Sequence, residues 1–167
     1  SEVIGYLCHH FNSKPIFVDV VSKGYVPRLR EHLGAFHTIK ANLPEAEELA
    51  GIEIRSDRDL SRAADAVLKR GVRRMVISLG KDGVFYKDDE GLLMRKRTKE
   101  VTHMVNATGA GDALAAGLVY GYVTEQDLDH TLTIGMTAAI LTLNHKNTIN
   151  PELSAEMVNQ NIQEWRL

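Results

Sequence analysis

The chain has 167 residues and a formal net charge of −2, from 20 lysines and arginines against 22 aspartates and glutamates. This length fits one domain with a real hydrophobic core, and the near-neutral charge excludes a bulk attraction to nucleic acid or to a membrane surface. The single cysteine excludes an internal disulfide, and the longest apolar run (138–143) is too short for a bilayer span. Since no secretory signal is visible either, we expect a cytoplasmic protein.

The hydrophobic pattern predicts helices that alternate with strands. In chain order we expect a helix over 3–11, a strand over 16–21, a short helix over 27–33, a strand over 37–40, a helical turn over 44–49 and a helix from 56 or 57 to 69. A strand over 74–79, a turn over 80–83, a hairpin of 84–87 with 92–95, a stretch over 101–105 that returns to the sheet, and helices over 109–123, 124–145 and 151–162 follow.

This order of elements argues for an α/β fold with a largely parallel sheet flanked by helices, to which the hairpin adds an antiparallel edge. Thr124, with Asp127 three positions on, resembles a capping box for the helix that ends near His145. The first helix has no preceding strand. The chain is therefore either a small complete fold or the back half of a larger one.

The strongest local signal is the stretch Asn106-Ala-Thr-Gly-Ala-Gly-Asp112, which follows an expected strand and opens a helix rich in small residues. The amides of Ala110, Gly111 and Asp112 would be free at the helix start, where the helix dipole favours an anion. Glycines at 109 and 111 let a phosphoryl group approach the backbone. Asp112 beside that site can accept a proton from an attacking hydroxyl while the amides take up charge on the phosphoryl group.

Two other nucleotide-binding motifs do not fit this stretch. A dinucleotide fingerprint needs a glycine where Leu114 stands, and a P-loop needs a Gly-Lys-Ser/Thr ending that is absent. On the pattern alone, a purely structural helix start stays open, with Asp112 as a partner of the helix dipole.

The stretch 106–112 resembles the second signature of the ribokinase family of carbohydrate kinases, also called the PfkB family, whose usual form is Asp-Thr-x-Gly-Ala-Gly-Asp. Two further family marks stand in the same order: 42–45 is similar to an Asn-x-x-Glu motif, and 78–83 is similar to a Thr/Ser-Leu-Gly-x-x-Gly turn. The resemblance covers nearly the whole chain. It implies a ribokinase-like fold and ATP-dependent transfer of a phosphoryl group to a hydroxyl of a sugar or nucleoside.

The resemblance also implies a role for each matched residue. Asp112 would be the base, with Gly109, Ala110 and Gly111 as the anion hole; Asn42 and Glu45 would serve Mg²⁺; and Ser78, Gly80, Lys81, Gly83, Thr108 and Asn147 would line ATP. Asn106 stands where the family has an aspartate that helps hold a monovalent cation. It keeps an oxygen ligand and loses the charge, so a need for K⁺ is left open.

Within the family, several stretches are most similar to bacterial pseudouridine kinases, which implies the 5′-hydroxyl of pseudouridine as the acceptor; these stretches are 17–22, 37–42, 106–108 and 150–154. The family's first signature, its substrate aspartate and its small β-sheet lid find no match. We therefore expect residues 1–167 to form the nucleotide-binding C-terminal part of a ribokinase-like domain that lacks its N-terminal substrate half. Its partners would be a small-molecule substrate and a second copy or a partner chain, without nucleic acid or membrane.

Two alternatives remain for the function. The chain could be a nucleotide-binding module or truncated kinase fragment without catalysis, or a structural α/β domain without a ligand. Among the other residues, Asp19 is unusual inside an apolar run and is expected to end a strand or cap a turn, while His103 and His145 are expected to pack or be solvated.

Overall fold

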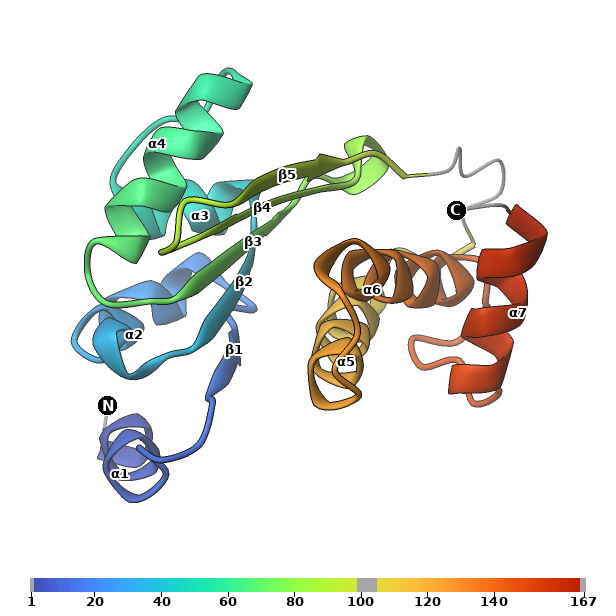
Figure 1. Cartoon of the computed structure of the whole chain (residues 1–167), viewed down its shortest axis with the longest axis horizontal. Coiled ribbons are helices and arrows are strands. Elements are labelled where there is room, and N and C mark those ends of the chain that lie inside the picture. Colours follow the sequence, from blue (N-terminus) through green and yellow to red (C-terminus); the bar gives the residue numbers. More distant parts are fainter. Residues whose placement is uncertain (1, 99–104, 166–167) are drawn as a thin grey trace. The chain divides into compact units, whose positions relative to one another are not determined.

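The computed structural model describes residues 2–98 and 105–165. The chain divides into two compact units. Unit 1 comprises residues 1–80 and 84–95, and unit 2 comprises residues 81–83 and 96–167. Figure 1 labels the elements of both, and each unit is described in turn.

Unit 1 alternates helices and strands as the sequence predicts. Its elements are α1 (Glu2–His10), β1 (Phe17–Asp19), η1 (Lys23–Tyr25), α2 (Val26–Arg30), η2 (Leu33–Ala35), β2 (Thr38–Asn42), α3 (Leu43–Ala50), α4 (Asp57–Leu68), β3 (Arg74–Ser78), β4 (Val84–Asp88) and β5 (Leu93–Lys96). A 3-10 turn, η3 (Gly80–Asp82), joins β3 to β4.

The strands form one five-stranded sheet in the order β1-β2-β3-β4-β5. β1, β2 and β3 are parallel, and β4 is antiparallel to β3, so the largely parallel sheet with an antiparallel edge is confirmed. The parallel register pairs Asp19, at the end of β1, with Lys40 in the middle of β2. It pairs Asn42 with Ser78, which are the last residues of β2 and β3.

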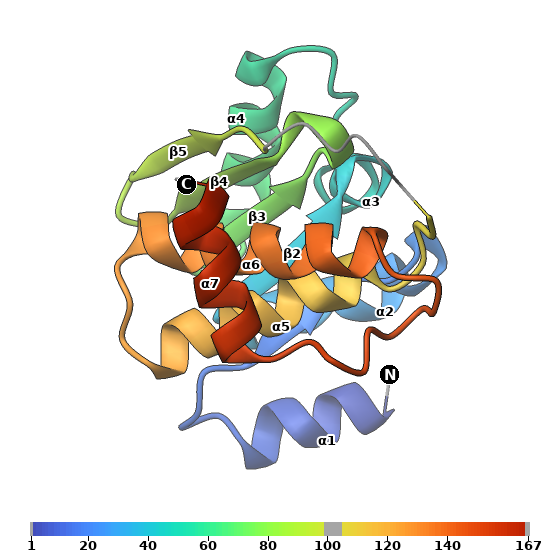
Figure 2. The same cartoon turned by 90° about the vertical axis from the view of Figure 1, so that its right-hand side faces the viewer.

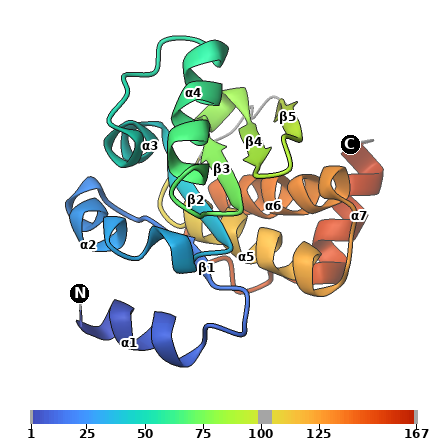
Figure 3. The same ribbon diagram turned by 60° about the vertical axis from the view of Figure 1, so that its left-hand side comes forward.

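Helices α3 and α4 pack against β2, β3 and β4, and α2 packs against α3 (Figure 3). The inward face of α4 is the expected apolar stripe, and Ser56 begins the helix by accepting a hydrogen bond from the Asp59 amide. Together these helices and the sheet enclose an apolar core whose buried members include Ile39, Leu49, Leu60, Val67, Met75, Ile77 and Phe85.

Unit 2 is built from α5 (Ala110–Val123), α6 (Leu128–Leu143) and α7 (Ala155–Trp165) (Figure 2). The α5 and α6 backbones approach closely because small residues face one another; a Cβ on Gly117 would lie 2.5 Å from the Gly135 Cα. Helix α7 packs on α6 and contributes Val158 and Ile162 to a second apolar cluster. No helix among the described residues is long and apolar enough to cross a membrane.

Several predicted boundaries are wrong. Thr124 ends α5, and its hydroxyl donates to the Tyr120 carbonyl at 2.8 Å, so it is not part of a capping box. Asp127 alone caps α6, because its side chain accepts from the His130 amide at 2.8 Å. Helix α6 ends at Leu143 and α7 begins at Ala155, four residues after the predicted start. The predicted return of 101–105 to the sheet falls largely outside the described residues.

Candidate active site

The start of α5 carries the strongest candidate site. Gly109 is the N-cap, with a φ of 88° that disfavours any residue with a side chain. A Cβ at this position would also overlap the Thr148 carbonyl oxygen. Glycine is therefore required here both by the backbone conformation and by the packing of the neighbouring loop.

The first turn of α5 comprises Ala110, Gly111 and Asp112. The first amides of a helix have no intrahelical partner, and Gly109 offers no side chain to cap them. The Asp112 carboxylate stands at the third helical position and is exposed. The structure thus brings together the four residues predicted as anion hole and base, with amides and a carboxylate at one helix end.

Two loops of unit 2 meet beside this helix start. Asn106 accepts a hydrogen bond from the Thr108 amide at 2.9 Å through Oδ1 and donates through Nδ2 to the Lys146 carbonyl at 3.4 Å. The Asn147 amide donates to Nδ1 of His145 at 3.1 Å, so this histidine has a local structural role. Asn106 and Thr108 precede α5, and Asn147 lies in the loop that contacts Gly109.

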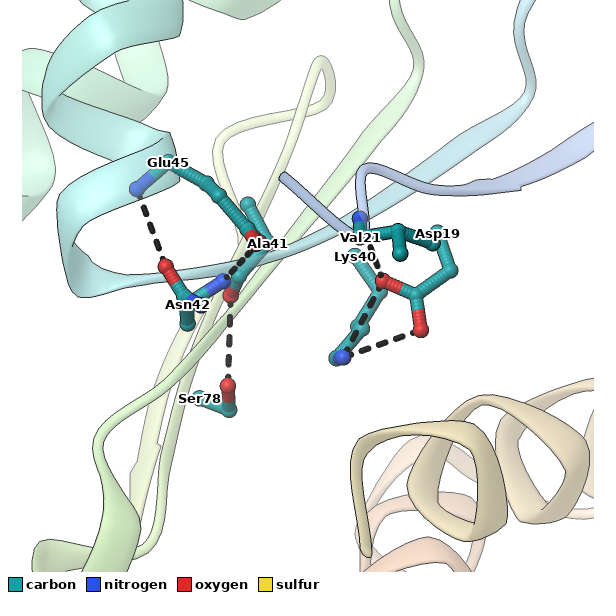
Figure 4. A network of polar contacts seen from close by, with 7 residues as sticks. All are labelled: Asp19, Val21, Lys40, Ala41, Asn42, Glu45 and Ser78. Atoms are coloured by element: carbon teal, nitrogen blue, oxygen red, sulfur yellow. Dashed lines mark hydrogen bonds and ion pairs between the residues drawn. The ribbon is translucent and has the colours of Figure 1, made fainter. Parts of the chain in front are cut away.

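Unit 1 holds the second set of predicted residues, at the carboxyl end of β2 (Figure 4). Asn42 caps α3 by accepting from the Glu45 amide at 2.9 Å, and Glu45 accepts in return from the Asn42 amide at 2.8 Å. Asn42 is exposed, whereas Glu45 is 3% exposed. Glu45 is therefore not a solvated acid. Its carboxylate is held beside an exposed amide side chain by a capping box.

An ion pair that the sequence analysis missed joins the middle of β2 to the end of β1 (Figure 4). The Lys40 ammonium lies 3.1 and 3.0 Å from the two Asp19 carboxylate oxygens, and the side chains are only 9% and 16% exposed. Asp19 ends β1 as predicted, and it also accepts from the Val21 amide at 3.4 Å. The available signal was one acidic and one basic residue, each next to apolar residues in its own predicted strand.

The predicted nucleotide turn follows β3. Ser78 ends β3 opposite Asn42, and its hydroxyl donates to the Ala41 carbonyl at 3.4 Å. Lys81 is exposed on η3, while Gly83 is buried against the backbone of 96–98, where a Cβ would overlap the chain.

The structure places the predicted residues in two groups. Asn42, Glu45, Ser78 and Gly80 belong to unit 1; Lys81, Gly83, Asn106, Thr108, Gly109, Ala110, Gly111, Asp112 and Asn147 belong to unit 2. Within each group the residues lie at the ends of helices and strands or in the turns and loops beside them. Among the described residues, no three His, Cys, Asp or Glu side chains gather as a metal site.

A family model for the pfkB family of carbohydrate kinases matches residues 4–155. Pseudouridine kinase of Escherichia coli is 33% identical over 154 residues, which cover 92% of this chain and 49% of that protein. The 1-phosphofructokinase of the same organism is 31% identical over 128 residues, which cover 75% of this chain and 40% of that protein. The chain belongs to the pfkB family of carbohydrate kinases.

Solved structures agree with this assignment. A crystal structure of a Clostridium perfringens protein assigned as a sugar kinase matches with a TM-score of 0.91 and 34% identity, covering 98% of this chain and 51% of that one. Arabidopsis thaliana ribokinase, solved with ribose and ATP, matches with a TM-score of 0.78 and 21% identity over 89% of this chain and 47% of that one, which shows the shared fold. The chain spans about half the length of the curated relatives it matches.

Proposed function

We propose that this chain supplies the nucleotide site and the catalytic base of an ATP-dependent kinase that phosphorylates a hydroxyl of a sugar or nucleoside. The observation that carries the proposal is the start of α5, where the first-turn amides and the Asp112 carboxylate lie together behind a glycine N-cap. Membership of the carbohydrate kinase family supports the same reaction class.

The chemistry needs little beyond positioning and charge. The acceptor hydroxyl oxygen forms a bond to the γ-phosphorus of ATP, while the bond from that phosphorus to the β–γ bridging oxygen breaks and ADP leaves with the electron pair. Asp112 accepts the hydroxyl proton. The amides of Ala110 and Gly111 donate to the phosphoryl oxygens as negative charge shifts onto them.

Asn42 and Glu45 are the residues that would serve Mg²⁺. Their oxygens are the ligand type that this ion prefers, and Mg²⁺ is usually held by one or two carboxylates completed by water and substrate phosphates. A complete protein cage is therefore not required at this strand end. When bound, Mg²⁺ supplies positive charge that neutralises the nucleotide phosphates.

The acceptor that we propose is the 5′-hydroxyl of pseudouridine. It is supported by the 33% identity to a pseudouridine kinase over most of this chain. Because the chain is also similar to a 1-phosphofructokinase, phosphorylated sugars are the competing class of phosphate acceptor. We further propose that residues 1–167 are the C-terminal part of the kinase, and that the contacts that choose the acceptor come from a segment outside this chain.

The test is the Asp112→Asn variant, made in the protein expressed from its complete reading frame. We expect kcat with pseudouridine to fall about 10²- to 10⁴-fold because the general base is lost, while ATP affinity is retained. Fructose 1-phosphate serves as the competing acceptor. The matched control is Asp127→Asn, because Asn and Asp are equally good N-caps and Asp127 lies at the start of another helix.

The alternative with a specific observation in its favour is a nucleotide-binding module without catalysis, because the chain spans only about half of its relatives. In that case wild type and Asp112→Asn both bind ATP and neither turns over any acceptor. A protein that binds no nucleotide in the presence of Mg²⁺ and K⁺ would refute both functions and leave a structural domain.

A further inference from the structure

The side-chain amide of Asn106 connects the two loops that flank the start of α5. Its Oδ1 accepts from the Thr108 amide at 2.9 Å, within its own loop. Its Nδ2 lies 3.4 Å from the Lys146 carbonyl oxygen, in the loop that follows α6. One planar group thus joins a donor on one loop to an acceptor on the other.

The orientation of this amide is determined by its partners. A backbone amide only donates and a backbone carbonyl only accepts, so the oxygen must face Thr108 and the nitrogen must face Lys146. An aspartate could satisfy Thr108 in the same way. An ionised aspartate could not donate to the Lys146 carbonyl, and its second oxygen would face that carbonyl unfavourably unless a cation or another donor stood between them.

The family resemblance assigns a monovalent cation to this place, beside an aspartate. The donor set of this chain does not fit such a cation, because the group that Asn106 directs at the Lys146 carbonyl is an N–H donor without a negative charge. We propose that the Asn106 amide takes the place of the monovalent cation, so that the loops around the anion hole keep their arrangement without K⁺.

Further contacts hold the same two loops together. The Val105 and Asn106 amides both donate to the Leu143 carbonyl, at 2.9 and 3.2 Å. The Gly109 Cα lies directly against the Thr148 carbonyl. The backbone before α5 is thus tied to the end of α6 and to the loop beyond it. An anion hole depends on donors whose positions are fixed before the substrate arrives. These hydrogen bonds fix the backbone around the start of α5 with protein atoms alone.

The test compares wild type with Asn106→Asp, in the protein expressed from its complete reading frame. The readout is the thermal unfolding midpoint in KCl and in choline chloride at equal ionic strength. A cation that binds only the folded state raises the midpoint, by roughly 5 °C or more at about 100 times its dissociation constant. We expect no K⁺-specific shift for wild type. We expect Asn106→Asp to be less stable in choline and to recover in K⁺.

Asn106→Ala is the control, because it loses both hydrogen bonds and gains no charge. It should be less stable than wild type in both salts and show no response to K⁺. The functional part of this inference rests on the proposed kinase activity, which would be independent of K⁺ in wild type and activated by K⁺ in Asn106→Asp. The unfolding midpoint needs no turnover, so it separates a failure of this inference from a failure of the proposed function.

Two outcomes would overturn the inference. A K⁺-specific rise in the wild-type midpoint would show that a cation binds in spite of the amide. A lack of response in both wild type and Asn106→Asp would show that residue 106 does not decide cation binding. If Asn106→Asp does not fold in either salt, ATP affinity of wild type with and without K⁺ decides: equal affinities support the inference and a loss without K⁺ refutes it.

Discussion

Glu45 has a structural role and a proposed chemical role, and a single substitution separates them. Its carboxylate completes the capping box of α3 from a nearly buried position. A glutamine completes a capping box as well as a glutamate but has no charge for Mg²⁺. We expect Glu45→Gln to keep most of the free energy of unfolding, because the capping box remains. We expect it to raise the Mg²⁺ concentration for half-maximal ATP turnover by about 10- to 100-fold.

The control for this prediction is Glu45→Ala, which removes the cap together with the charge. Urea unfolding should show a loss of about 0.5–2 kcal/mol for this variant. If Glu45→Gln is as unstable as Glu45→Ala, the charge itself holds the strand end together. If its Mg²⁺ dependence equals that of wild type, Glu45 is a capping residue and nothing more.

How well the sequence predicts the contacts of a residue depends on how far along the chain its partners lie. The partners of Glu45 lie three positions away, so the motif is visible in the sequence. Lys40 and Asp19 are 21 positions apart and meet only because β1 and β2 pair in one register. A buried ion pair rarely adds stability over apolar residues of similar size. Its presence two residues before the end of β2, which carries Asn42, therefore supports a functional region that the local pattern does not reveal.

At the scale of elements, the start of α5 depends on a glycine that cannot be replaced. Gly109 and Gly91 have nearly equal φ values, 88° and 92°, but only Gly109 has a neighbour that an added Cβ would meet. Both Gly→Ala variants should lose about 1–2 kcal/mol through backbone strain. Gly109→Ala should lose about 1–3 kcal/mol more of its free energy of unfolding, because the Thr148 loop must move. Its ATP affinity should also fall, whereas Gly91→Ala should bind ATP as well as wild type does.

Urea unfolding and equilibrium ATP binding check this pair of variants. Equal losses of stability would mean that the loop at Thr148 yields freely and does not hold the start of α5. Retained ATP affinity in Gly109→Ala would remove the helix start from the nucleotide site.

Elements with strong local signals were predicted well. Helix α4 has its apolar stripe, its Ser56 cap and its end close to the predicted places, and the parallel strands follow their apolar runs. The start of α6 was predicted too early because Thr124 and Asp127 both have cap chemistry, and Thr124 bonds backward to Tyr120 instead. The loop after α6 was predicted, but too short, because α6 ends at Leu143 and α7 begins only at Ala155. Its long-range contacts, such as that between Asn106 and Lys146, leave no local pattern in the sequence.

At the scale of the whole molecule, the apolar side chains of α1 are unusually exposed. Val3, Tyr6 and Leu7 are 73%, 59% and 45% exposed, and Phe11, in the turn that follows the helix, is 49% exposed. Only Cys8 of this helix is buried. Spaced three and four positions apart, these residues form one apolar stripe, and contiguous exposed stripes of this kind mark surfaces that another chain or segment covers.

We therefore expect residues 1–167 alone to associate as their concentration rises, which sedimentation velocity would detect. A Leu7→Lys and Phe11→Lys double variant should shift the chain toward monomer. Val123→Lys is the matched control, because Val123 is 66% exposed on another helix outside the stripe. A chain that stays monomeric throughout, or one that Val123→Lys disrupts equally, would contradict the prediction. If the product of the complete reading frame is longer and monomeric, we expect its additional segment to cover the α1 stripe. Protection of Val3, Tyr6 and Leu7 from solvent in that longer protein would show this directly.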